Sequence, residues 1–150
     1  MPQSLAKNLI HLVFSTKERR PLLEEAIREE LHRYACGILK DLESPALAVN
    51  SVADHVHLLF NLHRTKALAD VVMEVKRGTS KWIKTKGPQF AEFHWQAGYG
   101  AFSVSQSAVA EVAEYIRKQA EHHQKLTFQE EFRRLLQRYE IEFDERYAWD

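Results

Sequence analysis

Two histidines separated by one residue could hold a metal ion in this sequence. His55 and His57 open the apolar stretch 55–62, which favours a β-strand. Side chains alternate across a strand, so both imidazoles would project from the same face. Two imidazoles on one face can bind a divalent metal and leave positions open for substrate oxygens. Such a short spacing also arises by chance, so the pair alone slightly favours an interpretation as ordinary strand histidines.

A tyrosine and a glutamine four residues apart form a second candidate group. Tyr115 and Gln119 would be neighbours on one helix face, at the shoulder of an apolar stripe. His122 continues that shoulder. On helix spacing alone, a half-buried tyrosine with a polar neighbour is the commoner arrangement.

The two groups are chemically complementary. A tyrosine hydroxyl has a pKa of about 10 and attacks poorly at neutral pH, so the attacked phosphate must be polarised and held in line. A metal on His55 and His57, completed by the Gln119 carbonyl, would do both. Attack on DNA would leave it joined to Tyr115 through a phosphodiester. Because that bond stores the cleaved linkage, rejoining would need no ATP.

The elements that must position these residues follow a definite order. Apolar periodicity and turn signals predict a β-α-β-β-α-β succession, with strands over residues 9–15, 46–52, 55–62 and 99–105. This order predicts an α+β, ferredoxin-like fold, in which an antiparallel sheet carries helices on one face. C-terminal helices, one of them bearing Tyr115, follow the sheet.

Local signals predict where the helices begin. Pro21 is expected to open the first helix, because proline is favoured at the first helical position. Ser107 can cap the helix that carries Tyr115, and the segment from Thr127 to Glu130 is a capping box that opens the last helix. The predicted buried positions of the first and third helices are Ile27, Leu31, Tyr34, Ile38 and Leu42, and Val109, Val112, Ala113, Ile116 and Ala120.

Length and composition indicate a single domain over residues 1–150, without a membrane span. No run approaches the roughly 18 apolar residues that a span needs, and the N-terminus lacks the features of a signal peptide. The one cysteine, Cys36, cannot form an internal disulfide. A cytoplasmic location is therefore expected.

The charge is balanced overall but segregated locally. The 21 basic and 21 acidic side chains give a net charge of zero, which argues against a protein that coats duplex DNA. Residues 76–86 nevertheless carry several basic side chains and no acidic one. If the chain binds DNA, phosphate contact is the expected role of its basic helix face and of a basic loop. These residues are Arg77, Lys81 and Lys84 on the helix, and Lys17, Arg19 and Arg20 in the loop.

Several stretches together resemble the single-tyrosine HUH transposases of the insertion-sequence-200/605 type. His55-Val56-His57, preceded by Val52-Ala53-Asp54, and Tyr115-Ile116-x-x-Gln119 look like the paired signatures of that family. The similarity extends over nearly the whole chain in the same order. The further similar stretches are residues 14–17, 80–83 and 95–105.

The resemblance implies a chemistry and an assembly. In that family the histidine pair and the glutamine bind Mg²⁺ or Mn²⁺, and the tyrosine becomes linked to the 5′ end of single-stranded DNA. The proteins are homodimers that recognise hairpins near transposon ends, so Tyr115 of one protomer is expected to serve His55 and His57 of the other. One departure is Lys118, which stands where the family often has asparagine before the glutamine.

Two alternatives remain open at this stage. A rolling-circle replication initiator also pairs such a histidine site with a tyrosine, and Tyr115 to Lys118 fits its tyrosine-x-x-lysine pattern. The flanking stretches instead resemble the transposases, and the 150 residues contain no helicase domain. The second alternative is a domesticated DNA-binding relative without activity. A histidine-triad nucleotide hydrolase is excluded, because Leu59 occupies the place of its third alternating histidine.

Overall fold

The computed structural model describes residues 2–122 and 125–150. Its strands and helices are β1 (Leu9–Ser15), α1 (Glu25–Asp41), β2 (Ala46–Ser51), β3 (His55–Asn61), α2 (Leu68–Ile83), β4 (Gly100–Val104), α3 (Val109–Arg117), α4 (Gln119–His122) and α5 (Phe128–Arg138). Short 3-10 turns cover Lys17–Arg19, Lys84–Lys86, Pro88–Phe90 and Gln106–Ala108. The four strands form one antiparallel sheet in the order β2-β3-β1-β4. The predicted α+β fold is therefore confirmed, and each predicted strand lies within a residue of its expected bounds.

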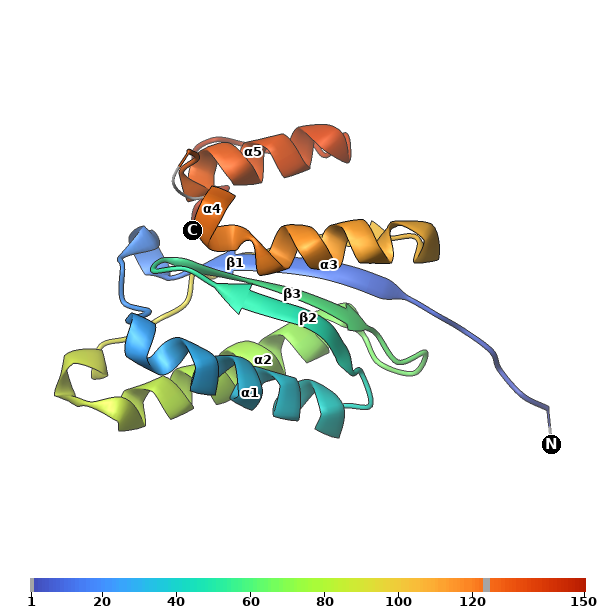
Figure 1. Cartoon of the computed structure of the whole chain (residues 1–150), viewed down its shortest axis with the longest axis horizontal. Helices are drawn as coiled ribbons and strands as arrows, with labels where there is room; N and C mark the ends of the chain where they lie inside the picture. The colour runs from blue at the N-terminus through green and yellow to red at the C-terminus, as the bar shows by residue number, and fades with distance from the viewer. Residues whose placement is uncertain (1, 123–124) are drawn as a thin grey trace.

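The sheet separates two layers of helices. In Figure 1, α1 and α2 cover one face, while α3 and α5 lie over the other. Because side chains alternate along a strand, Leu12 and Phe14 of β1 and Leu58 and Phe60 of β3 belong to the main core against α1 and α2. The residues between them face α3 and α5. No helix of the described residues is both long and apolar enough to cross a membrane.

The face under α3 and α5 holds two separate apolar clusters. One cluster joins α3 to the strands and includes Leu59 and Ile116. The other joins α5 to β1 and β4 and includes Phe102 and Phe132. Gly100 allows the second contact, because a Cβ at this position would collide with the ring of Phe132. Buried polar residues of this layer, among them His11, His57 and Glu131, belong to neither cluster.

The first helix begins later than predicted. The expectation that Pro21 opens it is wrong, because the following residues pair with the connection between β2 and β3. The Leu23 amide donates to the Ala53 carbonyl at 2.9 Å, and the Leu23 side chain is fully buried. Tyr34, expected on the buried face of α1, is 43% exposed, and Ala35 is buried instead.

The third helix is shorter than predicted at both ends. Ala108 occupies its N-cap position, so the expected Ser107 cap is wrong. The Ser107 hydroxyl lies 3.0 Å from that of Ser105 instead. The helix ends before Lys118, whose φ of −94° and ψ of 21° interrupt it. Ala120, expected on the buried stripe, is therefore beyond the helix and exposed.

The start of the last helix follows the sequence prediction. The Thr127 hydroxyl accepts a hydrogen bond from the Glu130 amide at 3.2 Å and donates one to the Glu130 carboxylate at 3.1 Å. The predicted N-cap at Thr127 is therefore confirmed, while the Glu130 carboxylate accepts from the Thr127 hydroxyl, where a capping box has it accept from the N-cap amide. These contacts fix the first turn of α5, and Glu131 is the residue directly after Glu130 on that helix.

Candidate active site

The two histidines of β3 are fully buried on the side of the sheet that faces α3 and α5. The Nδ1 atom of His55 lies 2.7 Å from Asp54 Oδ1. The Nδ1 atom of His57 lies 2.8 Å from His11 Nε2. A partner on Nδ1 fixes the ring orientation of a metal-binding histidine. Both Nε2 atoms can therefore be presented to one common point.

Glu131 of α5 reaches that point. Its Oε1 atom lies 3.2 Å from His55 Nε2 and 3.0 Å from His57 Nε2. Its side chain is only 2% exposed, and a carboxylate this deeply buried needs charged or hydrogen-bonding partners. One possible ligand atom from each of the three residues lies within 4.8 Å of the other two. This spacing is compatible with metal–ligand bonds of about 2.0–2.3 Å around a single divalent ion.

The second oxygen of Glu131 contacts the other candidate group. The Tyr115 hydroxyl donates a hydrogen bond to Glu131 Oε2, and Gln119 Nε2 donates to the same oxygen at 3.3 Å. Tyr115 lies on α3 and Gln119 begins α4, so the two are not on one continuous helix as predicted. They nevertheless meet at one carboxylate, in the same chain as the histidines. The side chain of His122 lies outside the described part of the structure.

Asn50 of β2 anchors the end of α3. Its Nδ2 atom donates to the carbonyls of Ile116 and Arg117, each at 3.0 Å. The last carbonyls of a helix have no partner within the helix, so a side-chain donor from the sheet satisfies them and fixes the helix end. The turn that carries Tyr115 is thereby held against the strand next to β3.

Burial and neighbouring charges set the protonation of these groups. Burial lowers the pKa of His11 to about 3, and the neighbouring His57 acts in the same direction. Burial is also the largest single influence on His55 and lowers its pKa, but hydrogen bonds and charge from Asp54 and Glu131 outweigh it and raise the pKa. Burial, together with the Glu131 carboxylate, raises the pKa of Tyr115. The Tyr115 hydroxyl is therefore protonated at neutral pH.

The sequence interpretation missed three residues that contact the histidines and the tyrosine. Glu131 carried a signal that could have been used, because it lies on the same helical stripe as Phe128, Phe132 and Leu135, where an acidic residue is unusual. His11 carried no such signal, and Asp54 entered only as part of the stretch that precedes His55. Their roles depend on the pairing of β1 with β3 and on the turn before β3.

The predicted basic helix face lies away from this site. Arg77 and Lys81 are exposed on α2 and Lys84 on the turn that follows, in the layer across the sheet from Tyr115. Arg77 forms an ion pair with Glu74 at 3.3 Å. The structure therefore does not bring these three side chains to the histidines.

The predicted basic loop borders the end of β3 where His55 lies. The backbone of Thr16, just before Lys17, donates to the Asp54 carbonyl at 2.8 Å. Lys17 and Arg20 are exposed, and Arg19 is partly buried. Arg20 forms an ion pair with Glu18 at 3.0 Å. This loop is therefore nearer to the candidate active site than the α2 face is.

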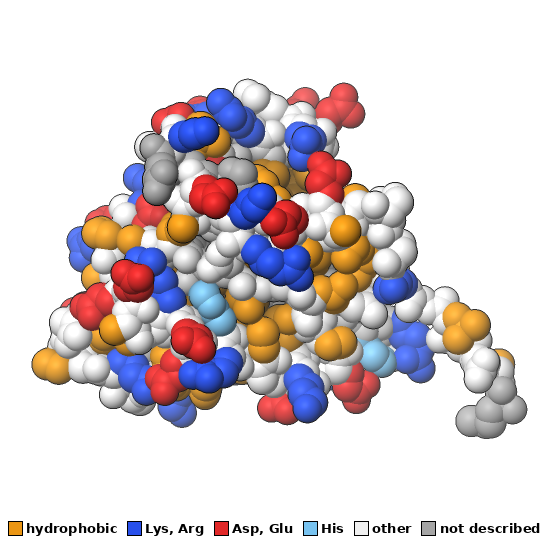
Figure 2. Space-filling view, viewed as in Figure 1, with side chains coloured by type: hydrophobic (Ala, Val, Ile, Leu, Met, Phe, Trp, Pro, Cys, Tyr) orange, Lys and Arg blue, Asp and Glu red, His pale blue; other side chains and the backbone are white. Residues whose placement is uncertain are grey.

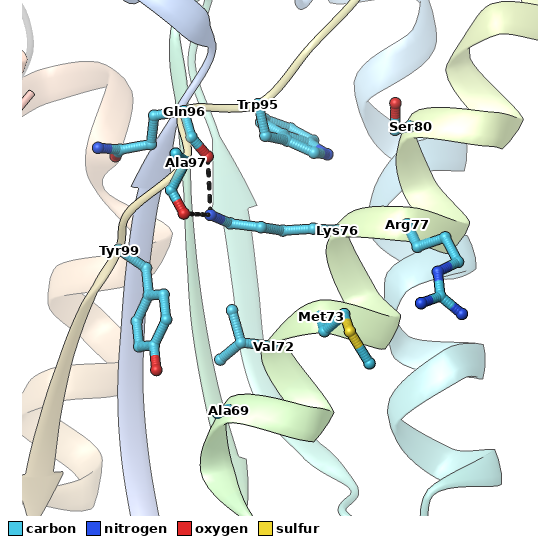
Figure 3. A pocket seen from close by; sticks show the side chains of 10 residues that line it. All are labelled: Ala69, Val72, Met73, Lys76, Arg77, Ser80, Trp95, Gln96, Ala97 and Tyr99. Carbon is cyan, nitrogen blue, oxygen red and sulfur yellow. Dashed lines mark hydrogen bonds between the residues drawn. The ribbon is translucent and has the colours of Figure 1, made fainter. Parts of the chain in front are cut away.

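Lys76, which precedes Arg77, has a structural role. Figure 3 shows its side chain crossing an open hollow beside α2 toward the loop before β4. Its Nζ atom lies 2.8, 3.2 and 2.6 Å from the carbonyls of Gln96, Ala97 and Gly98. Burial lowers its pKa to about 8. Lys76 therefore holds this loop in place within the fold.

A comparison with known protein families matches residues 4–119 to the family described as transposase IS200 like. The chain belongs to this family. The resemblance seen in the sequence is thus confirmed, and the matched range includes both histidines, Tyr115 and Gln119. It ends before α5, so Glu131 comes from outside the matched part of this IS200-like transposase chain.

Two solved structures share the fold of this IS200-like chain. One is a candidate transposase from Deinococcus radiodurans R1, with 23% identity, a TM-score of 0.62, and coverage of 79% of this chain and 98% of that one. The other is a REP-associated tyrosine transposase bound to a REP hairpin, with 15% identity, a TM-score of 0.61, and coverage of 82% of this chain and 73% of that one. A search of curated proteins found no match.

Proposed function

We propose that this chain is a transposase that cuts and rejoins single-stranded DNA at transposon ends, using Tyr115 as nucleophile and a divalent metal ion. One observation carries the proposal. The Tyr115 hydroxyl and the Nε2 atoms of His55 and His57 all contact the Glu131 carboxylate within one chain. Burying ionisable groups costs free energy unless they are paired and hydrogen-bonded, and clusters of such groups are typical of functional sites.

His55, His57 and Glu131 would hold the ion, with Gln119 joining them through its amide oxygen. A divalent ion there would polarise the scissile phosphate and offset the charge that develops on its oxygens. The set suits Mn²⁺ or Mg²⁺. Because Mg²⁺ prefers oxygen ligands and two of these ligands are imidazole nitrogens, Mn²⁺ is the better fit.

The chain's own residues account for the nucleophilic step. The Tyr115 oxygen forms a bond to phosphorus as the bond from phosphorus to the 3′ oxygen breaks, which leaves a 5′-phosphotyrosine and a free 3′ hydroxyl. The protonated tyrosine must release its proton as it attacks. Glu131 Oε2 already accepts the hydrogen bond of that hydroxyl, so it is placed to take the proton. Attack by a 3′ hydroxyl on the phosphotyrosine reverses these steps and rejoins the strand.

The direct test is a covalent adduct between the protein and DNA. The full chain is incubated with Mn²⁺ and single-stranded oligonucleotides from the ends of its own genetic element, then denatured and separated by size. We expect a protein–DNA species that survives denaturation and requires the metal. An adduct only with replication-origin DNA would indicate a rolling-circle initiator. Binding without any adduct would indicate a DNA-binding relative without activity.

We further propose that the exposed α2 face holds a DNA hairpin, as the solved REP-associated relative is bound to one. Arg77, Lys81 and Lys84 lie across the sheet from Tyr115, so the hairpin and the cleaved strand would occupy different faces. Lys17, Arg19 and Arg20 lie near His55 and would contact the cleaved strand. This division assigns the two predicted basic groups to different segments of DNA.

Neutralising the α2 face should weaken hairpin binding equally for all stem sequences. Lys81→Gln or Lys84→Gln removes one phosphate contact, so the slope of log affinity against log salt should fall by about 0.9. Fluorescence anisotropy with a labelled hairpin measures this slope. Arg33→Gln, at an exposed position on α1, is the matched control and should leave the slope unchanged. A loss confined to one stem sequence would indicate base recognition and contradict the phosphate role.

The resemblance to the family also leads us to propose a homodimer. In such a dimer Tyr115 of one chain would serve His55 and His57 of the other. This chain brings Tyr115 to its own histidines, with ring centroids of Tyr115 and His57 5.9 Å apart. Association of two copies is therefore not required to assemble a site.

Mixed oligomers distinguish a site within one chain from a shared site. His57→Ala chains and Tyr115→Phe chains, each inactive alone, are mixed and allowed to exchange subunits. If each chain uses its own tyrosine, as the geometry favours, every site carries a lesion and no adduct returns. If sites are shared, one composite site is intact, and the adduct appears on the His57→Ala chain. Native mass spectrometry must verify that mixed dimers are present.

A further inference from the structure

A cavity of about 400 Å³ lies between α3 and α5 and opens onto the candidate active site. His11, Tyr115 and Glu131 all line it. The space arises because α3 and α5 pack on the sheet through two separate apolar clusters. Its volume falls within the range of about 300–1,000 Å³ that is typical of small-molecule sites.

The cavity combines apolar walls with basic side chains. Val112 of α3, Leu135 of α5 and Tyr139, the residue just after α5, contribute apolar surface. Arg134 and Arg138 of α5 also line the cavity, and both are exposed. This combination matches a nucleotide, whose base is largely apolar on its faces and whose phosphates are anionic.

Two acidic groups share the cavity with the arginines. Glu131 lies at the active-site end, where its Oε1 atom contacts the histidines, and Glu111 of α3 also lines the cavity. Arg138 lines the same cavity as Tyr115 and Glu131. An anion bound in this cavity beside the Tyr115 hydroxyl would therefore share the cavity with the Arg138 guanidinium.

We propose that this cavity binds the nucleotide that remains attached to Tyr115 after cleavage, with its base against the apolar walls and its 3′ phosphate at Arg134 and Arg138. The inference rests on the proposed function and extends it by assigning a nucleotide-binding site. Both arginines lie on α5, beyond the family-matched residues 4–119.

The direction of attack determines which of the two nucleotides at the cleaved bond lies at the cavity. In an in-line displacement the leaving 3′ oxygen departs on the side of phosphorus opposite the Tyr115 oxygen, whereas the retained nucleotide stays bonded to the phosphate held by Tyr115. The cavity opens on the Tyr115 hydroxyl. A base enclosed by Val112, Leu135 and Tyr139 cannot also pair with a complementary strand. The cavity therefore supplies a physical reason for a preference for single-stranded DNA.

Thymidine 3′,5′-bisphosphate tests this site without DNA cleavage, because it carries the base and both phosphates of one retained nucleotide. The full chain is titrated with it in the presence of Mg²⁺ and followed by NMR. Thymidine 5′-monophosphate, which lacks the 3′ phosphate, is titrated in parallel. We expect shifts at the amides of Val112 and Leu135, and about tenfold tighter binding of the bisphosphate, as one charge-assisted contact provides.

Arg138→Gln, alone and combined with Arg134→Gln, should reduce this tenfold preference toward equality. Both positions are exposed, so the variants should fold, and the melting temperature verifies this. Arg117→Gln, an exposed position on α3 outside the cavity, is the matched control and should retain the full preference. The proposal is overturned if the two nucleotides bind equally to the unmodified chain, if the shifts map elsewhere, or if Arg117→Gln has the same effect as Arg138→Gln.

The adduct assay separates this inference from the proposed function. An adduct with DNA but no nucleotide binding in the cavity would refute the inference and leave the transposase chemistry intact. Nucleotide binding as expected without any adduct would support the cavity as a nucleotide site and refute the cleavage chemistry.

Discussion

Tyr115→Phe should abolish the covalent protein–DNA adduct, with a loss of about 10³-fold or more in its rate of formation. The substitution removes only the hydroxyl oxygen that would attack phosphorus. DNA binding should persist, because the ring and its contacts on α3 remain. Quantifying the denaturation-resistant adduct and measuring binding by anisotropy on the same preparation checks both parts.

Tyr115→Phe needs two controls, a second tyrosine variant and a measurement of stability. Tyr34→Phe, which alters an exposed tyrosine of α1, should form the adduct at the rate of the unmodified chain. Glu131 Oε2 loses one of its hydrogen-bond donors in Tyr115→Phe, so the melting temperature should be followed. An undiminished adduct from a folded Tyr115→Phe chain would show that another tyrosine, such as Tyr34 or Tyr99, is the nucleophile.

His57→Ala should eliminate both cleavage and the stabilisation of the protein by Mn²⁺. The substitution removes a metal ligand and also deprives buried Glu131 of a partner, which costs about 1–3 kcal/mol of folding free energy. The melting temperature with and without Mn²⁺, together with the Mn²⁺ electron paramagnetic resonance signal, reports on binding without depending on cleavage. His94→Ala, at an exposed position with no assigned role, should behave like the unmodified chain.

Glu131→Gln determines whether the carboxylate belongs to the metal site. Glutamine keeps the size of the side chain but removes the charge that a divalent ion requires. We expect the Mn²⁺ affinity to fall by at least about tenfold, while the histidines stay in place. An unchanged affinity in Glu131→Gln, combined with its loss in His57→Ala, would leave the histidines as ligands and exclude Glu131.

The periodic parts of this fold were predictable from the sequence. Alternating apolar residues identified the four strands, and helical spacing identified α2 and α5. The beginning of α1 was not predictable, because Leu23 is held by the Ala53 carbonyl, a partner some thirty residues away in the sequence. Local propensity placed Pro21 in a helix, and this tertiary contact overrides it.

The candidate site was predictable as two pairs of residues but not as a unit. Spacing alone linked His55 to His57 and Tyr115 to Gln119. The group that joins the two pairs, Glu131, comes from a helix that begins long after β3, and no local rule connects it to them. Its position on the apolar stripe of α5 was the available sign. Surface charge does not mark the site either, because Lys, Arg, Asp and Glu side chains are interspersed over the face shown in Figure 2.

The contact between Glu131 and the two histidines links ion binding to the docking of the last helix. An ion held by atoms from both β3 and α5 binds the docked arrangement and not an undocked one. At a concentration 100 times its Kd, it would therefore make detachment of α5 harder by about 2.7 kcal/mol. By the same coupling, a change that weakens the docking of α5 also weakens ion binding. Docking requires a glycine at position 100, because a Cβ there would collide with the ring of Phe132. A side chain at position 100 would thus lower the affinity for the ion, although β4 supplies none of the proposed ligands, and amide exchange in α5 would report the occupancy of the metal site.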